Sequence, residues 1–175
     1  MSDLPLLFKA LSFAAKYHSG QKRKGASGEP YINHPIAVAR FLAEVGQVRD
    51  VNLLCAALLH DTIEDTEATE SLLRENFSDT ITNIVIEVTD DKSLPKAERK
   101  RQQVAHAPTL SDSARLLKLA DKTNNLGDLK DTPPQGWDVE RIRRYFDWAE
   151  EVVSQVRGLN PAMDAAYDRI AAQKP

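Results

Sequence analysis

The sequence predicts an all-α protein built as a single domain. Apolar residues recur at helical spacing along most of the chain, and the run Ile84-Val85-Ile86, which on its own suggests a strand, has no partner strand elsewhere. The length of 175 residues suits one domain that buries roughly 70% of the surface of its unfolded chain. Hydrophobic residues make up 42% of the chain and charged residues 28%, as in ordinary globular proteins. We therefore expect one compact helical bundle over residues 1–175.

The first half of the chain shows the helical pattern in five places. Leu4 and Phe8 fall on one face of a first helix, and Pro35 suits the first turn of the next, which places His34 just ahead of that helix. The apolar run 53–59 predicts a buried third helix. The expected helices cover residues 4–17, 36–45, 51–63, 67–77 and 81–89.

The second half shows the pattern in four more places. A turn is expected at 89–95, and the segment 131–136 is too short, and too closely flanked by packing helices, to be a domain linker. The helix after the turn is strongly basic. The expected helices cover residues 96–105, 114–129, 139–156 and 162–172.

Composition excludes several classes of protein. The net charge of -3 gives no reason to expect a nucleic-acid partner, and no window approaches the ~20 apolar residues of a membrane span. Lys9 and Lys16 interrupt the apolar N-terminal segment, so a secretory signal is not expected. The single cysteine, Cys55, lies in an apolar run and rules out an internal disulfide. We expect a cytoplasmic protein; its oligomeric state cannot be predicted.

Two clusters of cations could attract an anionic ligand. The loop 19–30 is rich in glycine and carries Lys22, Arg23 and Lys24 in succession. Such a run is usually a solvated basic turn, but a flexible loop of this kind can also present charge to phosphates, and an arginine can stack on a base. The second cluster, at 96–101, is equally compatible with a solvated face and with anion binding.

The segment that follows the buried run 53–59 carries one imidazole and three carboxylates within six residues: His60, Asp61, Glu64 and Asp65. On a continuous helix His60 shares a face with Glu64, and Asp61 shares one with Asp65. Neighbouring His and Asp side chains can bind one divalent metal ion. Alternatively, the pair caps a buried helix and the later acids are solvated.

A second acidic residue lies where acids are rare. Asp121 falls near or inside the apolar face of the helix predicted at 114–129, and buried aspartates are usually paired. Its partner could be a metal ion or a cation such as Lys118. Asn125, one turn further on, faces the same way as Asp121.

Together the chain offers two imidazoles and two carboxylates, each at a helix end or on a buried helix. This donor set suits Mn²⁺, Fe²⁺ or Zn²⁺ better than Ca²⁺. An ion with open positions lowers the pKa of bound water and neutralises charge on a phosphate oxygen, which is chemistry suited to phosphoester hydrolysis. The candidate ligands are His34, His60, Asp61 and Asp121.

These motifs resemble the HD-domain metal phosphohydrolases, with an HD core at about 32–127. More narrowly, the chain resembles the hydrolase domain of the RelA/SpoT homologue family, and most of all its stand-alone small alarmone hydrolases, which include metazoan SpoT homologues. The segments that carry the resemblance are 20–24, 30–35, 56–66, 88–92, 118–122 and 145–149.

The resemblance implies a hydrolase that uses one Mn²⁺ ion to remove the 3′-pyrophosphate of guanosine tetra- or pentaphosphate, (p)ppGpp, giving GDP or GTP and pyrophosphate. It assigns the four candidate ligands to the metal, and it assigns Glu64 and Asp65 to positioning or deprotonating the attacking water. The expected substrate-binding residues are Lys22, Arg23, Lys24, Asn125 and Tyr145.

One position departs from the family pattern. Gly127 stands where relatives often have a basic residue, so a phosphate contact is lost if relatives use that residue for one. A glycine could also end or loosen the helix there.

Two other functions remain open at this point. The same residues could hydrolyse another phosphorylated nucleotide such as NADPH. The fold could also serve as a nucleotide sensor without enzymatic activity, although the presence of all four ligands and both acids disfavours a dead site.

Overall fold

The computed structural model describes residues 3–25 and 28–175. Two residues of the predicted basic loop, Ala26 and Ser27, lie outside this part, as do the first two residues of the chain. Within the described part the regular structure is helical, apart from two isolated β-bridges. The prediction of an all-α protein is confirmed.

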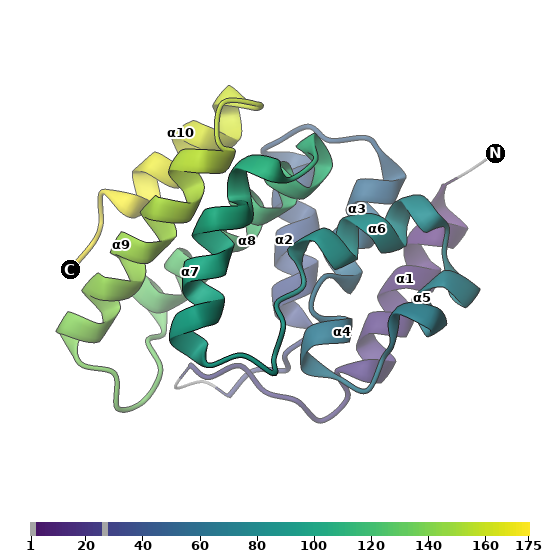
Figure 1. Cartoon of the computed structure of the whole chain (residues 1–175), viewed down its shortest axis with the longest axis horizontal. Coiled ribbons are helices and arrows are strands. Elements are labelled where there is room, and N and C mark those ends of the chain that lie inside the picture. Colours follow the sequence, from purple (N-terminus) through teal and green to yellow (C-terminus); the bar gives the residue numbers. More distant parts are fainter. Residues whose placement is uncertain (1–2, 26–27) are drawn as a thin grey trace.

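The helices follow one another with short connections, except for longer loops after α1, α6 and α8 (Figure 1). Their bounds are α1 (Leu4–Tyr17), α2 (Asn33–Glu44), α3 (Val51–Leu59), α4 (Thr62–Asp65), α5 (Glu70–Asn76), α6 (Asp79–Val88), α7 (Lys96–His106), the 3₁₀ turn η1 (Ala107–Thr109), α8 (Asp112–Asp131), α9 (Val139–Val156) and α10 (Pro161–Ala171).

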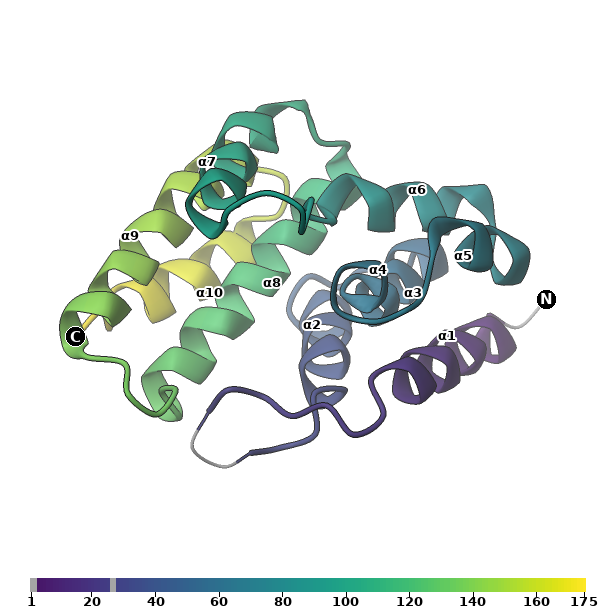
Figure 2. The ribbon, with the colours of Figure 1, turned by 60° about the horizontal axis from the view of Figure 1, so that its bottom comes forward.

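Two helices organise the packing. Helix α3 is buried along most of its length and packs against α1, α2 and α6, while the long helix α8 packs against α2, α6, α9 and α10. Figures 1 and 2 place α1 and α5 at one end of the molecule and α9 and α10 at the other, with α2 and α8 between them. As expected for a small core residue, Cys55 is fully buried on α3, and burial raises the pKa of its thiol to about 11.

The loops after α1 and α8 meet at one end of the bundle. Gly25, in the loop after α1, pairs with Pro134, in the loop after α8, through an isolated β-bridge. A Cβ atom at Gly25 would lie only 2.8 Å from the carbonyl oxygen of Thr132, so this close approach requires glycine. Through this contact the basic loop lies next to the end of α8 (Figure 2).

The predicted single helix over 51–63 is wrong. Helix α3 ends at Leu59, and Asp61 adopts φ -97° and ψ -2° before the short helix α4 begins. The buried hydroxyl of Thr62 donates to the carbonyl oxygen of Leu59 at 2.7 Å and so satisfies a helix-terminal acceptor. The chain therefore turns at His60-Asp61, and the acids that follow leave the axis of α3.

Other boundaries differ less. Helix α2 begins at Asn33, so His34 lies within its first turn and not ahead of it. Helix α5 begins at Glu70, later than predicted, because the side chain of Thr69 caps it by accepting from the backbone N–H of Leu72 at 3.2 Å. Helix α8 continues through Gly127 to Asp131, so this glycine does not end the helix.

Gly127 is a helix-interior glycine, and a Cβ atom built there meets nothing within 4 Å. Replacing it by alanine is therefore expected to stabilise the protein by about 1 kcal/mol, because alanine loses less backbone entropy in a helix. Thermal unfolding should show a melting temperature about 2–4 °C higher. The matched control is Gly20→Ala: its Cβ also meets nothing, but φ is +79°, so this change should destabilise the protein. A Gly127→Ala melting temperature below that of the unmodified chain would contradict the prediction.

Candidate metal centre and nucleotide pocket

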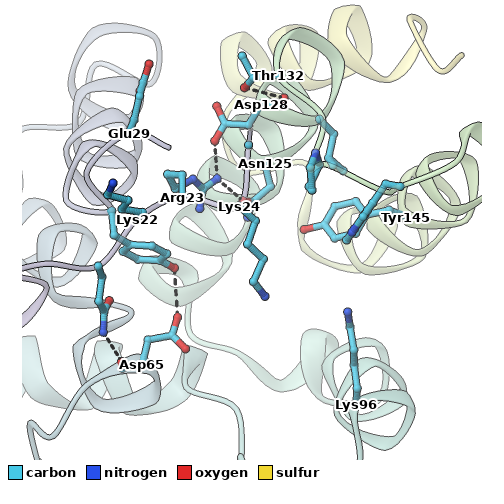
Figure 3. Close-up of a pocket in the computed structure, with 16 residues that line it drawn as sticks. Lys22, Arg23, Lys24, Glu29, Asp65, Lys96, Asn125, Asp128, Thr132 and Tyr145 are labelled. Atoms are coloured by element: carbon cyan, nitrogen blue, oxygen red, sulfur yellow. Dashed lines mark hydrogen bonds and ion pairs between the residues drawn. The ribbon is translucent and has the colours of Figure 1, made fainter. Parts of the chain in front are cut away.

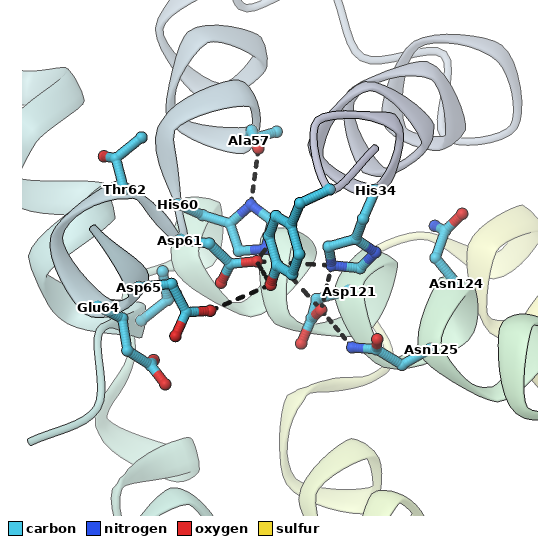
Figure 4. A network of polar contacts seen from close by, with 12 residues as sticks. His34, Ala57, His60, Asp61, Thr62, Glu64, Asp65, Asp121, Asn124 and Asn125 are labelled. Atoms are coloured by element: carbon cyan, nitrogen blue, oxygen red, sulfur yellow. Dashed lines mark hydrogen bonds and ion pairs between the residues drawn. The ribbon is translucent and has the colours of Figure 1, made fainter. Parts of the chain in front are cut away.

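Three helical segments bring His34, His60 and Asp121 to one point. His34 comes from the first turn of α2, His60 directly follows α3, and Asp121 lies in the middle of α8. Each offers one ligand atom, and these atoms all lie within 4.8 Å of one another (Figure 4). Asp61, the fourth predicted ligand, places its Oδ2 atom 3.2 Å from His60 Nε2 and 3.8 Å from His34 Nε2. The four side chains selected from the sequence therefore converge.

The hydrogen bonding of His60 fits a metal ion. Its Nδ1 atom lies 2.7 Å from the carbonyl oxygen of Ala57, so Nδ1 carries the proton and donates. In the neutral ring, the form that binds a metal ion, this leaves Nε2 as the lone-pair donor, and among the described residues that buried atom has no hydrogen-bond partner. A histidine whose second nitrogen donates to a backbone carbonyl is the usual arrangement at metal sites, since the bond fixes the tautomer and the ring orientation.

The carboxylates around His60 also favour a bound cation. Burial lowers the pKa of His60, but the carboxylates of Asp61 and Asp121 outweigh burial and raise that pKa to about 9. Burial alone would raise the pKa of Asp121, yet Lys122 and His34 hold it well below its usual range. Burial likewise raises the pKa of Asp61, but His60 and His34 outweigh burial and hold it below its usual range, so both carboxylates are in the ionised form that a metal ligand must have.

Two neighbours on α8 fix the orientation of Asp121. Lys122 Nζ lies 3.1 Å from Oδ2, and Asn125 Nδ2 donates to Oδ1 at 2.6 Å. Asn125 therefore faces Asp121, as predicted. The suggestion that Lys118 pairs with Asp121 is wrong, because its ammonium donates to the carbonyl oxygen of Val88 at 3.0 Å.

The two acids of α4 lie beside this cluster, each with its own surroundings (Figure 4). Glu64 accepts from the backbone N–H of Asp90 at 3.2 Å, and burial and the charge of Asp90 raise the pKa of its carboxyl. Asp65 forms an ion pair with Lys92, whose Nζ lies 2.5 Å from Oδ1. The predicted column of His60 with Glu64 does not form, since α3 has ended, and Glu64 faces the turn after α6.

The hydroxyl of Tyr31 joins the metal cluster to the acids. It lies 2.7 Å from Asp61 Oδ2 and 3.1 Å from Asp65 Oδ2. Burial and these two carboxylates raise the pKa of the phenol, so the group stays protonated and serves as a donor. Sequence reasoning did not select Tyr31, although its position three residues before His34 brings the two side chains close together, with ring centroids 6.1 Å apart.

A pocket of about 450 Å³ opens next to these residues. Asp65 and Tyr31 line it, and the basic loop and the end of α8 form much of its wall (Figure 3). All five predicted substrate-binding residues line it: Lys22, Arg23, Lys24, Asn125 and Tyr145. The structure thus places the selected cations and polar groups in a single cavity of the size that takes a small ligand.

Arg23 occupies the centre of the loop-side wall. It donates to Asn125 Oδ1 at 3.0 Å, forms an ion pair with Asp128, and lies over the ring of Tyr31 with its Cζ atom 5.5 Å from the centroid. Because Asn125 also binds Asp121, a chain of two hydrogen bonds links the pocket wall to the metal cluster.

The second basic cluster divides between the site and the surface. Lys96 lines the pocket, and Arg99 NH1 lies 3.7 Å from Glu64. Lys100 lies over the ring of Trp148 at 4.3 Å, where burial and the charge of Lys96 lower its pKa to about 8. Arg101 is exposed and pairs with Glu98. Part of this cluster thus lies at the site and part of it is a solvated face, so neither the expected anion binding nor the expected solvated face describes the whole cluster.

Trp137 is a further pocket residue that sequence reasoning missed. It lines the cavity with Tyr145, and the guanidinium of Arg141 lies over its ring at 4.2 Å. The available signal was an aromatic residue beside the basic helix start at 139, which alone is too common to select.

None of the helices in the described ranges is long and apolar enough to cross a membrane.

Comparison with known proteins identifies the family to which this chain belongs. The family model of the HD domain matches residues 10–148. The guanosine-3′,5′-bis(diphosphate) 3′-pyrophosphohydrolase MESH1 of Danio rerio is 49% identical over 99% of this chain and 96% of its own length. The corresponding protein of Homo sapiens is 46% identical over 99% of this chain and 97% of its own length.

Among solved structures, one is described as a metazoan orthologue of SpoT that hydrolyses ppGpp and plays a role in starvation responses. It has a TM-score of 0.93 and 43% identity, and the match covers 95% of this chain and 94% of that chain. The resemblance drawn from the sequence motifs is confirmed. The chain belongs to the HD-domain family and, within it, to the group that includes the MESH1 pyrophosphohydrolases.

Proposed function

We propose that this protein is a Mn²⁺-dependent pyrophosphohydrolase that removes the 3′-pyrophosphate of (p)ppGpp. Water would be consumed, and GDP or GTP and pyrophosphate would be released. The observation that carries the proposal is the convergence of two imidazoles and two carboxylates at the edge of a cation-lined pocket, with the unpartnered Nε2 atom of His60 among them.

The metal ligands in this proposal are His34, His60, Asp61 and Asp121. Their mixed nitrogen and oxygen donors suit Mn²⁺ better than Ca²⁺, which takes oxygen ligands. The ion would supply Lewis-acid chemistry, offsetting charge on a phosphate oxygen and favouring the ionisation of water. Lys122 and Asn125 keep Asp121 oriented for this task.

Glu64 and Asp65 would handle the attacking water. Both lie on α4, directly after the metal cluster, and Asp65 also lines the pocket. A carboxylate within reach of the water can hold it in line or take its proton, which is general-base catalysis. The raised pKa of Glu64 moves it closer to neutral pH, where a base can both accept and release a proton.

The pocket would hold the nucleotide. A guanosine bearing two pyrophosphates is strongly anionic, and the cations of the loop-side wall provide the opposite charge in a protein whose net charge is -3. Arg23 can also stack on a base. Gly127 supplies no side chain here, so any phosphate contact that a basic residue makes at this position in relatives is missing.

The test is side-by-side turnover of ppGpp and NADPH by metal-stripped protein reloaded with Mn²⁺. We expect GDP and pyrophosphate from ppGpp, identified by anion-exchange chromatography and mass spectrometry. Release of single phosphates from ppGpp would contradict a pyrophosphohydrolase. Turnover of NADPH alone would assign the site to that substrate, and binding of ppGpp without turnover would make the protein a nucleotide sensor.

A further inference from the structure

The hydroxyl of Tyr31 occupies a position that the proposed reaction does not yet explain. It lies between two carboxylates with separate tasks: Asp61, on the metal side, at 2.7 Å, and Asp65, on the water side, at 3.1 Å. Two carboxylates this close to one group repel each other, and a shared proton donor offsets that repulsion. In the described part of the chain, no other side chain forms hydrogen bonds with both Asp61 and Asp65.

The phenol ring is held firmly in this position. His18 stacks against it, with ring centroids 4.9 Å apart and an interplanar angle of 28°. Gln21 is bound at both ends, because its Oε1 atom lies 2.8 Å from His18 Nδ1 and its Nε2 atom donates to the carbonyl oxygen of Asp65 at 2.7 Å. The backbone N–H of Tyr31 donates to the carbonyl oxygen of Gln21 at 2.9 Å. The ring and the Asp65 backbone are thus parts of one bonded unit.

We propose that Tyr31 is a positioning residue for the hydrolytic site, whose hydroxyl sets the distance between the metal-side carboxylate Asp61 and the water-side carboxylate Asp65. The inference rests on the proposed function, which gives these two acids their roles. It extends that function because the Tyr31 hydroxyl would align the metal ion with the attacking water through Asp61 and Asp65, without contacting either the ion or the water. Tyr31 also lines the pocket, so it lies beside both the nucleotide site and the two acids.

Tyr31→Phe tests the proposal, because it removes the hydroxyl and keeps the ring. We expect kcat for ppGpp to fall 10- to 100-fold with KM changed less than about threefold, as is typical when the partner of a metal ligand is lost. The affinity for Mn²⁺, measured by titration without substrate, should fall by about tenfold. The matched control is Tyr17→Phe, a tyrosine of α1 that stacks on Phe13 outside the site; it should leave all three values unchanged. Tyr31→Phe with unchanged kcat and unchanged Mn²⁺ affinity would overturn the proposal.

A double-mutant cycle shows whether Tyr31 acts through Asp65. At saturating Mn²⁺, Tyr31→Phe should cost less than about threefold in kcat when Asp65 is already replaced by asparagine, because coupled residues are not additive. Equal losses in the two backgrounds would mean that the hydroxyl does not act through this acid. If the unmodified protein fails to hydrolyse ppGpp, the proposed function fails, whereas the Mn²⁺ titration of Tyr31→Phe still tests the contact with Asp61.

Discussion

His60→Asn is expected to abolish Mn²⁺ binding and to lower ppGpp turnover by at least about three orders of magnitude, since a catalytic ion contributes several kcal/mol and each 1.36 kcal/mol is tenfold in rate. Asparagine is chosen because its amide can replace the Nδ1 donor that binds the Ala57 carbonyl oxygen. The change therefore removes the Nε2 ligand with little other loss. Bound Mn²⁺ should be measured by elemental analysis after gel filtration, and turnover by chromatography.

The matched control is His106→Asn, which changes an exposed histidine at the end of α7 in the same way. It should bind one equivalent of Mn²⁺ and turn over substrate like the unmodified protein. Stoichiometric Mn²⁺ in His60→Asn, held as tightly as in the control, would show that this imidazole is not a ligand. The folded state of both variants should be checked by circular dichroism, because His60 is buried.

The sequence was informative about the site because the ligands stand out chemically. A buried aspartate in an apolar helix and a histidine beside an aspartate at the end of an apolar run are costly unless something binds them. Their types and order therefore predicted that Asp121, His60 and Asp61 would meet, and the structure brings them together. The helical periods of α6 and α9 were equally readable, because each has one buried face. For α1 the extent was predicted but the face was wrong, because Leu4 and Phe8 are exposed and Ala10 and Ala14 are buried.

What could not be predicted depends on contacts between distant segments. The end of α3 at Leu59 is the local exception: the Thr62 hydroxyl donates to the Leu59 carbonyl oxygen three residues earlier, and no propensity marks that threonine as the start of a new helix. Lys122, not Lys118, is the partner of Asp121 because α8 packs against α6, where Lys118 donates to the Val88 carbonyl oxygen. Tyr31 was missed for a related reason: an aromatic residue is usually core, and only the fold shows its hydroxyl between two acids.

Glu64→Gln should separate activity from stability. Loss of the carboxylate is expected to lower kcat by about 10²- to 10⁴-fold, the range for removal of a general acid or base. Glutamine can still accept from the Asp90 N–H, so the local hydrogen bond survives. Single-turnover measurements at saturating Mn²⁺ would report the chemical step. The control is Glu67→Gln, an exposed residue just beyond α4, which should retain full activity.

The stability of Glu64→Gln should depend on pH in a defined direction. Burial, together with the charge of Asp90, raises the folded-state pKa of Glu64, so the protonated form fits the fold better than the ionised form. Such a group contributes stability that is fully present below its unfolded pKa of about 4.3 and is lost as pH rises through the higher folded value. The variant cannot ionise at this position, so its melting temperature relative to the unmodified protein should rise between pH 4 and pH 7. Two results would contradict the assignment of Glu64: a variant as active as the unmodified protein, or a variant whose relative stability falls over that interval. Falling relative stability would mean that the cations Lys92 and Arg99, which lie within 4 Å of the carboxylate, outweigh its burial.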